Sequence, residues 1–170
     1  MKISATLALL FASLFLFFSQ PVAAQSGAVN DFALEDLDGN THRLSQYLEK
    51  GPVYISFWAM WCQPCLHKMR LLTPLHKKYA EQGFTLLAIN TDDPNSLSRV
   101  RSYISAQRYD FPVLLDPDER VFEQFNGRSL PFAVMVDTNG RVVQTDVGFL
   151  PGDEVKIGEK IEELLNPAAE

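Results

Sequence analysis

The sequence predicts an α/β protein built around a mixed β-sheet, and three observations support this prediction. Two apolar runs, Val53–Trp58 and Phe84–Asn90, have the length and continuity of buried strands. Amphipathic helical stretches alternate with strands along the chain, as they do in βαβ units. Near the C-terminus, two further runs flank Asp137-Thr138-Asn139-Gly140, which is a strong hairpin signal. The predicted order is therefore a βαβ-type half, then an antiparallel hairpin and a closing helix.

Turn signals and helical spacing predict the other elements. The runs 32–34 and 41–44 flank Asp38-Gly39-Asn40, which predicts an N-terminal β-hairpin. Apolar residues recur at helical spacing from Cys62 to about Gln82, and Pro74 should kink this helix or end its first segment. The remaining predictions are a helix over 96–107, a strand over 113–115, a helix over 119–125, strands over 132–136 and 142–147, and a helix over 153–165 with Val155, Ile161 and Leu164 facing inward.

The first 24 residues have the pattern of a secretory signal peptide, which leaves residues 25–170 as the domain. Lys2 supplies the positive charge, the stretch Ile3–Phe18 is apolar, and the small residues Val22–Ala24 stand at the cleavage position. The alternative is an uncleaved membrane anchor. That stretch has 16 residues, whereas a spanning helix needs roughly 20. We therefore expect cleavage and export to the bacterial periplasm or an equivalent oxidising space.

The composition limits the possible partners. Without the signal segment, the chain keeps 146 residues, with 14 basic residues against 21 acidic ones and a net charge of −7. This size suits one domain with a hydrophobic core, and the negative charge argues against a nucleic-acid partner. Cys62 and Cys65 are the only cysteines. An exported protein with one such pair has no spare structural disulfide, so the pair is free for chemistry.

The segment Trp61-Cys62-Gln63-Pro64-Cys65 follows a predicted buried strand and stands where a helix should begin. The backbone N–H groups of a first helical turn and the helix dipole stabilise a thiolate, which is the attacking species in disulfide exchange. The second sulfur is near enough to close a disulfide within one turn. Cys62, at the more exposed helix start, is therefore the candidate nucleophile, and Cys65 the candidate resolving cysteine.

Two other uses of the cysteines fit the sequence less well. A zinc site needs four ligands, and His67 and His76, nine residues apart on one helix, are a poor match to one coordination shell. A peroxiredoxin would place Pro and Thr seven and three residues before its cysteine, whereas this chain has Ile55 and Ala59 there. We therefore expect no metal site and no other cofactor.

The stretch Phe57–Cys65 resembles the active-site segment of the thioredoxin superfamily, and more narrowly that of the exported TlpA/ResA-like thiol–disulfide oxidoreductases. The resemblance covers nearly the whole mature chain and implies a thioredoxin-like three-layer sandwich. The Trp-Cys-x-Pro-Cys element is highly specific, and the other elements are supportive. These others are Phe32, Leu34, Asp36, Asp38 and Gly39 near the start, Leu114–Asp118, and Leu130-Pro131 followed by Asp137 and Asn139-Gly140.

This resemblance also implies roles for residues around the cysteines. It makes Pro131 a cis proline that faces the dithiol, and Leu130 a residue that hydrogen-bonds a substrate backbone. The alternative for Pro131 is a proline that merely starts a strand, where its missing N–H costs nothing. Trp61 is expected on an exposed apolar rim where substrates dock, together with Gln63 and Pro64.

The activity implied by the resemblance is reduction of exported protein disulfides, of the cytochrome c maturation type or similar. The partners would be protein disulfide or dithiol substrates and a membrane electron donor such as a DsbD/CcdA-like protein. A disulfide oxidase or isomerase remains open, because only the reduction potential separates it. A Cu(I)-binding chaperone, with both cysteines and His42, His67 or His76 as ligands, is a third interpretation.

The chain departs from the family pattern at two positions. Thioredoxins carry a buried acid six residues before the first cysteine, where this chain has Ser56, and many TlpA/ResA-like proteins carry Glu three residues after the second, where it has Lys68. Neither of these two positions therefore supplies a carboxylate for proton transfer. For Lys68 and Arg70 the sequence leaves two interpretations open: electrostatic tuning of the thiols or steering of an acidic partner, or a solvated helix face. For Lys77 and Lys78 we expect a solvated face.

Overall fold

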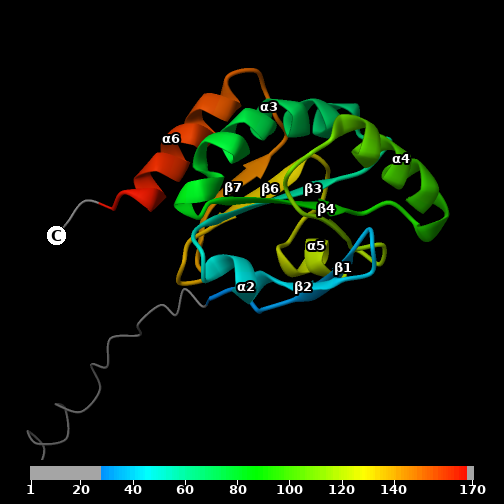
Figure 1. Cartoon of the computed structure of the whole chain (residues 1–170), viewed down its shortest axis with the longest axis horizontal. Coiled ribbons are helices and arrows are strands. Elements are labelled where there is room, and N and C mark those ends of the chain that lie inside the picture. Colours follow the sequence, from blue (N-terminus) through cyan, green and yellow to red (C-terminus); the bar gives the residue numbers. More distant parts are fainter. Residues whose placement is uncertain (1–27, 168–170) are drawn as a thin grey trace, which may run out of the picture.

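The computed structural model describes residues 28–167 and shows three layers, with helices on both faces of a central sheet (Figure 1). The predicted signal peptide, residues 1–24, lies outside the described residues, and so do residues 25–27 and 168–170 of the predicted domain. In the part of the chain that is described, no helix is both long and apolar enough to cross a membrane.

The central sheet is mixed, as the sequence predicts, and its strand order is β2-β1-β5-β4-β3-β6-β7. Strand β3 is an interior strand, parallel to β4 and antiparallel to β6. The β1–β2 hairpin is present and extends the sheet beyond β5. The strands are β1 (Ala33–Asp36), β2 (Thr41–Arg43), β3 (Val53–Trp58), β4 (Thr85–Asn90), β5 (Val113–Leu115), β6 (Phe132–Val136) and β7 (Val142–Val147).

Two groups of helices cover the two faces of the sheet. Helices α3, α4 and α6 lie on one face, and the short helices α2 and α5 lie on the other (Figure 1). The helices are α2 (Leu44–Leu48), α3 (Gln63–Tyr79), α4 (Leu97–Gln107), α5 (Arg120–Gln124) and α6 (Asp153–Leu165). Two 3₁₀ turns, η1 (Ala80–Gln82) and η2 (Pro94–Ser96), follow α3 and precede α4.

Burial on both faces explains why β3 is apolar at every position except Ser56. Successive side chains of a strand point to opposite faces, so Tyr54 and Trp58 pack under α3 while Ile55 and Phe57 pack under α5. All six residues of β3 are buried. The strand is therefore a rigid support, and it fixes the position of the loop that leaves its last residue.

Three details differ from the sequence expectations. Of the two outcomes expected at Pro74, a kink or an end of the first segment, the second is wrong. Helix α3 continues through Pro74 to Tyr79, because this proline is exposed while the buried Leu72, His76 and Tyr79 hold the helix to the core. Helix α2 was not predicted, since its five residues are too few to show a period.

The third difference is the orientation of Val155, which the sequence placed inward. Its side chain is 59% exposed, whereas Ile157 and Ile161 are buried. The latter two are four residues apart and define the inner face of α6. Val155 lies two residues before Ile157, which places it about 200° around the helix and toward solvent. Leu164 is half-buried against the core.

Candidate active site

The two cysteines lie where β3 gives way to α3, and they form a disulfide. Strand β3 ends at Trp58, three residues form a loop, and Cys62 is the N-cap of α3. The Cys62–Cys65 S–S distance is 1.94 Å and the Cα–Cα distance is 5.3 Å. Both residues are buried, Cys62 slightly less than Cys65, at 4% and 1% exposed. The difference in exposure is smaller than the sequence suggested.

The sulfur of Cys62 occupies the place of an N-cap side chain. The backbone N–H of Cys65 is shared between two acceptors of Cys62: it donates to the carbonyl oxygen over 3.0 Å and to Sγ over 3.3 Å. Pro64 stands in the first turn of the helix, where its missing N–H leaves no bond unmade. A thiolate at this sulfur would receive a backbone hydrogen bond and the positive end of the helix dipole. This contact distinguishes the two cysteines better than their exposure does.

A buried carboxylate holds the loop between β3 and the disulfide. The backbone N–H of Met60 donates to Asp92 Oδ2 over 2.7 Å, and the Asn90 side chain donates to the same oxygen over 2.8 Å. Asp92 was not predicted as a site residue. Its place in the sequence could have indicated this role. Asp92 follows β4, which runs parallel to β3, and the carboxyl ends of parallel strands meet at one edge of the sheet.

The Leu130–Pro131 peptide bond is cis, as the resemblance implied. Phe132 pairs with Phe57 in the sheet, so the antiparallel register places Pro131 level with Trp58 at the end of β3. The backbone N–H of Gly148 donates to Pro131 O over 2.8 Å and ties this turn to the end of β7. Leu130 packs against the core cluster that contains both cysteines.

The two tryptophans differ in exposure. Trp58 is fully buried, while Trp61, directly before Cys62, is 70% exposed. Gln63 and Pro64 are also exposed on the first turn of α3. Leu150, in the segment after β7, is 70% exposed as well. An exposed apolar side chain therefore stands directly beside a buried disulfide.

Lys68 is fully buried, so the solvated-face interpretation is wrong for this residue. Its Nζ lies 5.2 Å from the centre of the Tyr54 ring and 5.7 Å from that of Phe149, and it has no hydrogen-bond partner among the described residues. Arg70 and Lys77 are exposed on the same helix. The cations of α3 therefore divide into one buried and several exposed groups.

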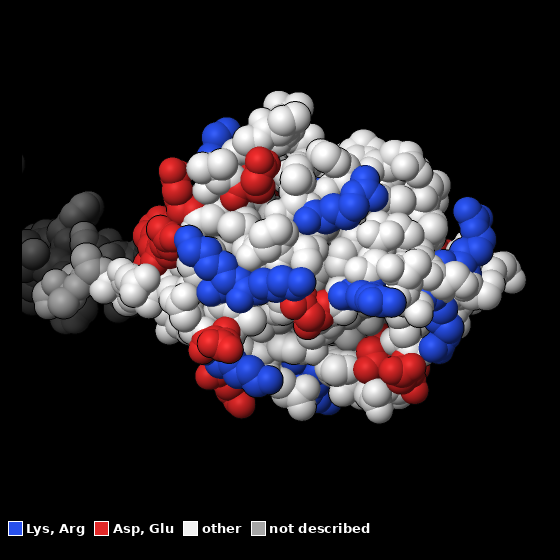
Figure 2. Space-filling model, turned by 45° about the horizontal axis from the view of Figure 1, so that its top comes forward, with Lys and Arg blue, Asp and Glu red and all other residues white. Residues whose placement is uncertain are grey.

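Exposed charges of both signs share this side of the molecule. Lys78, for example, forms an ion pair with Glu162 of α6 at 2.9 Å. Figure 2 shows basic and acidic side chains interspersed on the side where α3, α4 and α6 lie. Lys77 and Lys78 are exposed, as expected for residues on a solvated helix face.

The environment of Lys68 contains carboxylates, but none contacts its Nζ. Burial lowers the pKa of Lys68 to about 8, and the negative charges of Asp146 and Asp153 partly offset this shift. The Tyr54 hydroxyl donates to Asp146 Oδ2 over 2.6 Å. Burial, reinforced by the neighbouring Asp146 charge, raises the pKa of Tyr54 well above its usual range. The tyrosine is therefore a fixed, neutral donor.

Ser56 is buried at the position where thioredoxins carry an acid. In the sheet register it pairs with Ala133, which pairs with Asp146. Residues paired in this way lie on the same face of the sheet. Asp146 is therefore a carboxylate on the face that carries the dithiol helix, two strands from Ser56.

The histidines are separated in the structure. His42 lies on the N-terminal hairpin, where its ring bonds Asp36 at 2.9 Å and Tyr47 at 2.7 Å. His76 is buried in α3 and accepts a hydrogen bond from the Leu86 N–H. Within residues 28–167, no three His, Cys, Asp or Glu side chains gather in a way that could hold a metal ion.

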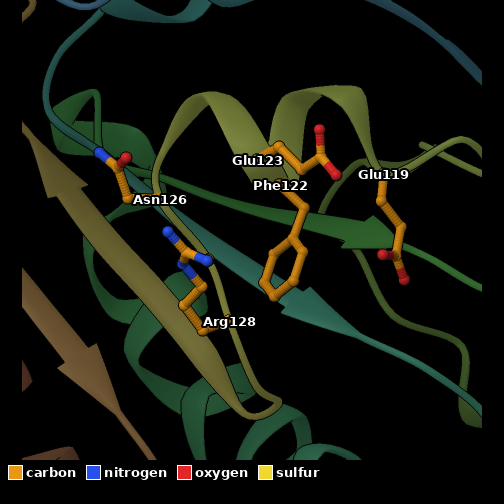
Figure 3. A pocket seen from close by; sticks show the side chains of 6 residues that line it. Glu119, Phe122, Glu123, Asn126 and Arg128 are labelled. Atoms are coloured by element: carbon orange, nitrogen blue, oxygen red, sulfur yellow. The ribbon is translucent and has the colours of Figure 1, made fainter.

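A surface pocket of about 360 Å³ lies beside α5, on the opposite face of the sheet from α3. Figure 3 shows the Phe122 ring between Arg128 and Glu119. A Cβ at Gly127 would collide with the Phe122 ring, so the ring in its present position needs a glycine there. This pocket does not include the disulfide. Its lining is Glu119, Phe122, Glu123, Asn126, Gly127 and Arg128.

Comparison with known proteins agrees with this geometry. The sequence model of the AhpC/TSA family matches residues 26–145. The chain belongs to this family. It is 35% identical to the thiol-disulfide oxidoreductase ResA of Geobacillus kaustophilus, over 82% of this chain and 79% of that protein. It is 31% identical to the protein of the same name from Halalkalibacterium halodurans, over 90% and 84% of the two chains.

A solved structure shares the fold. The crystal structure of a putative thiol:disulfide interchange protein DsbE from Chlorobium tepidum superposes with a TM-score of 0.74, at 28% identity, over 81% of this chain and 95% of that one. Within the AhpC/TSA family the chain is thus of the thioredoxin-like, ResA-like type. With a Cys-x-x-Cys disulfide at the start of α3, it is an enzyme of the thiol–disulfide oxidoreductase class.

Replacing Asp92 by alanine should loosen the loop before the disulfide. The substitution leaves the Met60 N–H and the Asn90 amide without their acceptor. We expect the free energy of unfolding to fall by about 1–3 kcal/mol, and exchange of the Met60 amide hydrogen to accelerate. Urea unfolding and hydrogen exchange measure the two effects.

Asp93→Ala is the matched control, because Asp93 caps η2 and is exposed. It should leave the Met60 amide protected. Equal protection of Met60 in the native and Asp92→Ala proteins would show that Asp92 does not hold the loop.

Proposed function

We propose that the protein is a periplasmic thiol–disulfide reductase of exported protein disulfides, with Cys62 as nucleophile and Cys65 as resolving cysteine. The observation that carries this proposal is the Cys62–Cys65 disulfide at the start of α3. The hydrogen bond from the Cys65 N–H to Cys62 Sγ carries the choice of nucleophile. It favours negative charge on one sulfur of the pair. The thiolate is the species that attacks a disulfide.

The proposed reaction has two exchange steps. The Cys62 thiolate attacks one sulfur of a substrate disulfide, whose S–S bond breaks as a mixed disulfide forms, and the other substrate sulfur leaves as a thiolate and takes up a proton. Cys65 then loses its proton and attacks Cys62 Sγ. The substrate departs as a dithiol, and the Cys62–Cys65 disulfide remains. Two electrons have passed from the protein to the substrate.

The surface around the disulfide supports a role in binding extended protein segments. We assign the apolar contact to Trp61, which is 70% exposed beside Cys62. Gln63 and Pro64 would lie against the same segment. Leu130, before the cis Pro131, would hydrogen-bond the substrate backbone, as the family resemblance implies. The sheet register, which places Pro131 beside the end of β3, supports this assignment.

The proposed location is the periplasm, reached through a signal peptide over residues 1–24. Support comes from the charged, apolar and small-residue pattern of that segment. In this compartment a membrane electron donor such as a DsbD/CcdA-like protein would return the disulfide to the dithiol. Cytochrome c maturation, or reduction of particular exported proteins, is the proposed use.

A disulfide oxidase or isomerase is the second candidate, and the burial of Lys68 favours it. A buried cation close to the cysteines stabilises a thiolate and therefore the reduced form. A protein with a stabilised reduced form is a stronger oxidant. The same cysteines would then carry electrons in the opposite direction.

The reduction potential separates the two directions. We expect a value nearer to that of thioredoxin, about −270 mV, than to that of a strong oxidant such as DsbA, about −120 mV. Equilibration of the purified protein with glutathione and dithiothreitol couples, and then quantification of free thiols, gives this value. A potential near the oxidising end would reject the reductase and favour the oxidase.

Trapping of mixed disulfides tests the partners. With Cys65→Ser the mixed disulfide cannot be resolved, so exported substrates and the membrane donor should remain linked to Cys62 and be identified by mass spectrometry. Cys62→Ser is the matched control and should trap little. If only cytoplasmic proteins are captured from intact cells, the periplasmic assignment fails.

A further inference from the structure

We propose that the Lys68 ammonium group is the buried counter-ion of the reduced active site, so that reduction of the disulfide and protonation of Lys68 are coupled. The ion partner of Lys68 would be the thiolate at Cys62. Lys68 would touch neither substrate nor electron donor and would act through that sulfur. This coupling requires thiol–disulfide exchange at Cys62–Cys65 and does not depend on its direction.

The environment of Lys68 is electrostatically unbalanced in the disulfide form. The side chain is 0% exposed, and its Nζ has no hydrogen-bond partner among the described residues. Two aromatic faces, Tyr54 and Phe149, lie against it. Lysine is almost never fully buried unless it is paired. A buried cation without a paired anion is costly, and its presence calls for an anion that appears in another state of the site.

The position of Lys68 on the helix brings it near the sulfur pair. Residues three apart on a helix are neighbours, with Cβ atoms about 5–6 Å apart, and Lys68 is three residues after Cys65. Cys62 Sγ is bonded to Cys65 Sγ, so the Cys62 sulfur lies next to the sulfur that is Lys68's helical neighbour. Both side chains are buried on the face of α3 that packs on the sheet. Cys62 and Cys65 belong to the same core cluster as Tyr54, whose ring contacts Lys68. The disulfide and the ammonium are therefore both buried against this cluster, which forms one water-poor compartment.

The carboxylates around Lys68 are bound to other groups. From β7, Asp146 is already engaged, since it accepts from the Tyr54 hydroxyl of β3 and from Gln144. From the start of α6, Asp153 is engaged by the Leu150 N–H and by Lys156. Both carboxylates favour the charged form of Lys68 without contacting it.

On its own helix, His67 packs edge-on against Phe149, the ring that also covers Lys68. The described acids near Lys68 thus have other partners. The remaining site where a negative charge can form in this compartment is the sulfur pair.

The coupled reaction conserves electrons and protons. A dithiol donor gives two electrons and two protons and becomes a disulfide, while the Cys62–Cys65 bond breaks. One proton goes to Cys65, which becomes a thiol, and Cys62 becomes a thiolate. When Lys68 is neutral, it takes the second proton; when it is already charged, that proton goes to solvent. Either way, the product holds an ammonium–thiolate pair.

Burial lowers the pKa of Lys68 to about 8 in the disulfide form. Lys68 can therefore change charge within a range that this chemistry reaches. Linkage is reciprocal: a thiolate that raises the pKa of Lys68 has its own pKa lowered by the same amount. A lysine with no electrostatic contact to the sulfur would show neither change.

The test compares Lys68→Met with Arg70→Met, which removes an exposed cation from the same helix. Thiolate absorbance near 240 nm, measured as pH is varied, gives the pKa of Cys62 in the reduced proteins. We expect Lys68→Met to raise it by at least about one unit, a tenfold change in the ionisation constant. Each tenfold loss of thiolate stabilisation should lower the reduction potential by about 30 mV. Arg70→Met should leave both unchanged.

A second measurement uses the native protein and needs no variant to fold. NMR titration of the Lys68 side-chain signal should give a higher pKa in the reduced protein than in the oxidised one. Thermal unfolding adds a contrast between redox states. Lys68→Met should raise the melting temperature of the oxidised protein, where the ammonium is unpaired, and should raise it less or lower it in the reduced protein.

The proposal is overturned if the native, Lys68→Met and Arg70→Met proteins titrate together, or if the pKa of Lys68 is the same in both redox states. These readouts do not depend on turnover. If the native protein failed to exchange with any disulfide, the proposed function would fall, while the titration of Cys62 would still decide the role of Lys68.

Discussion

The hydrogen bond from the Cys65 N–H to the Cys62 sulfur depends on where α3 begins, and the rest of the structure fixes that point. Strand β3 is buried along its whole length between β4 and β6, so its last residue cannot shift. Asp92, two residues after the end of the neighbouring strand β4, holds the loop at Met60. The sulfur is thereby placed at the positive end of a helix by the sheet itself.

Around the start of α3 the protein has a solvent-exposed side and a buried side. Trp61 is exposed next to the disulfide, where a protein substrate can meet it. About one turn further along α3, Lys68 lies against the Tyr54 and Phe149 rings with no access to water. Electrostatic interactions are stronger on the buried side because little solvent screens them there. The exposed side therefore suits recognition, and the buried side suits control of the thiolate.

Local sequence signals predicted much of the fold and the centre of the site. The strands at 53–58, 132–136 and 142–147 and helix α6 have the predicted bounds, because each has a clear apolar period or turn signal. The burial of Lys68 and the role of Asp92 could not be read in this way. Whether a lysine is covered depends on Phe149, a residue far along the chain. Asp92 acts on a loop 32 residues earlier, which only the parallel pairing of β3 and β4 brings near.

The central claim, that the helix start selects the sulfur of Cys62, is tested most directly by alkylation of the fully reduced protein near pH 7. Brief treatment with iodoacetamide and site-resolved mass spectrometry give the separate rates at the two cysteines. Cys62 should react much faster than Cys65, because its thiolate receives the Cys65 N–H and the helix dipole. Equal rates, or faster reaction at Cys65, would contradict the claim.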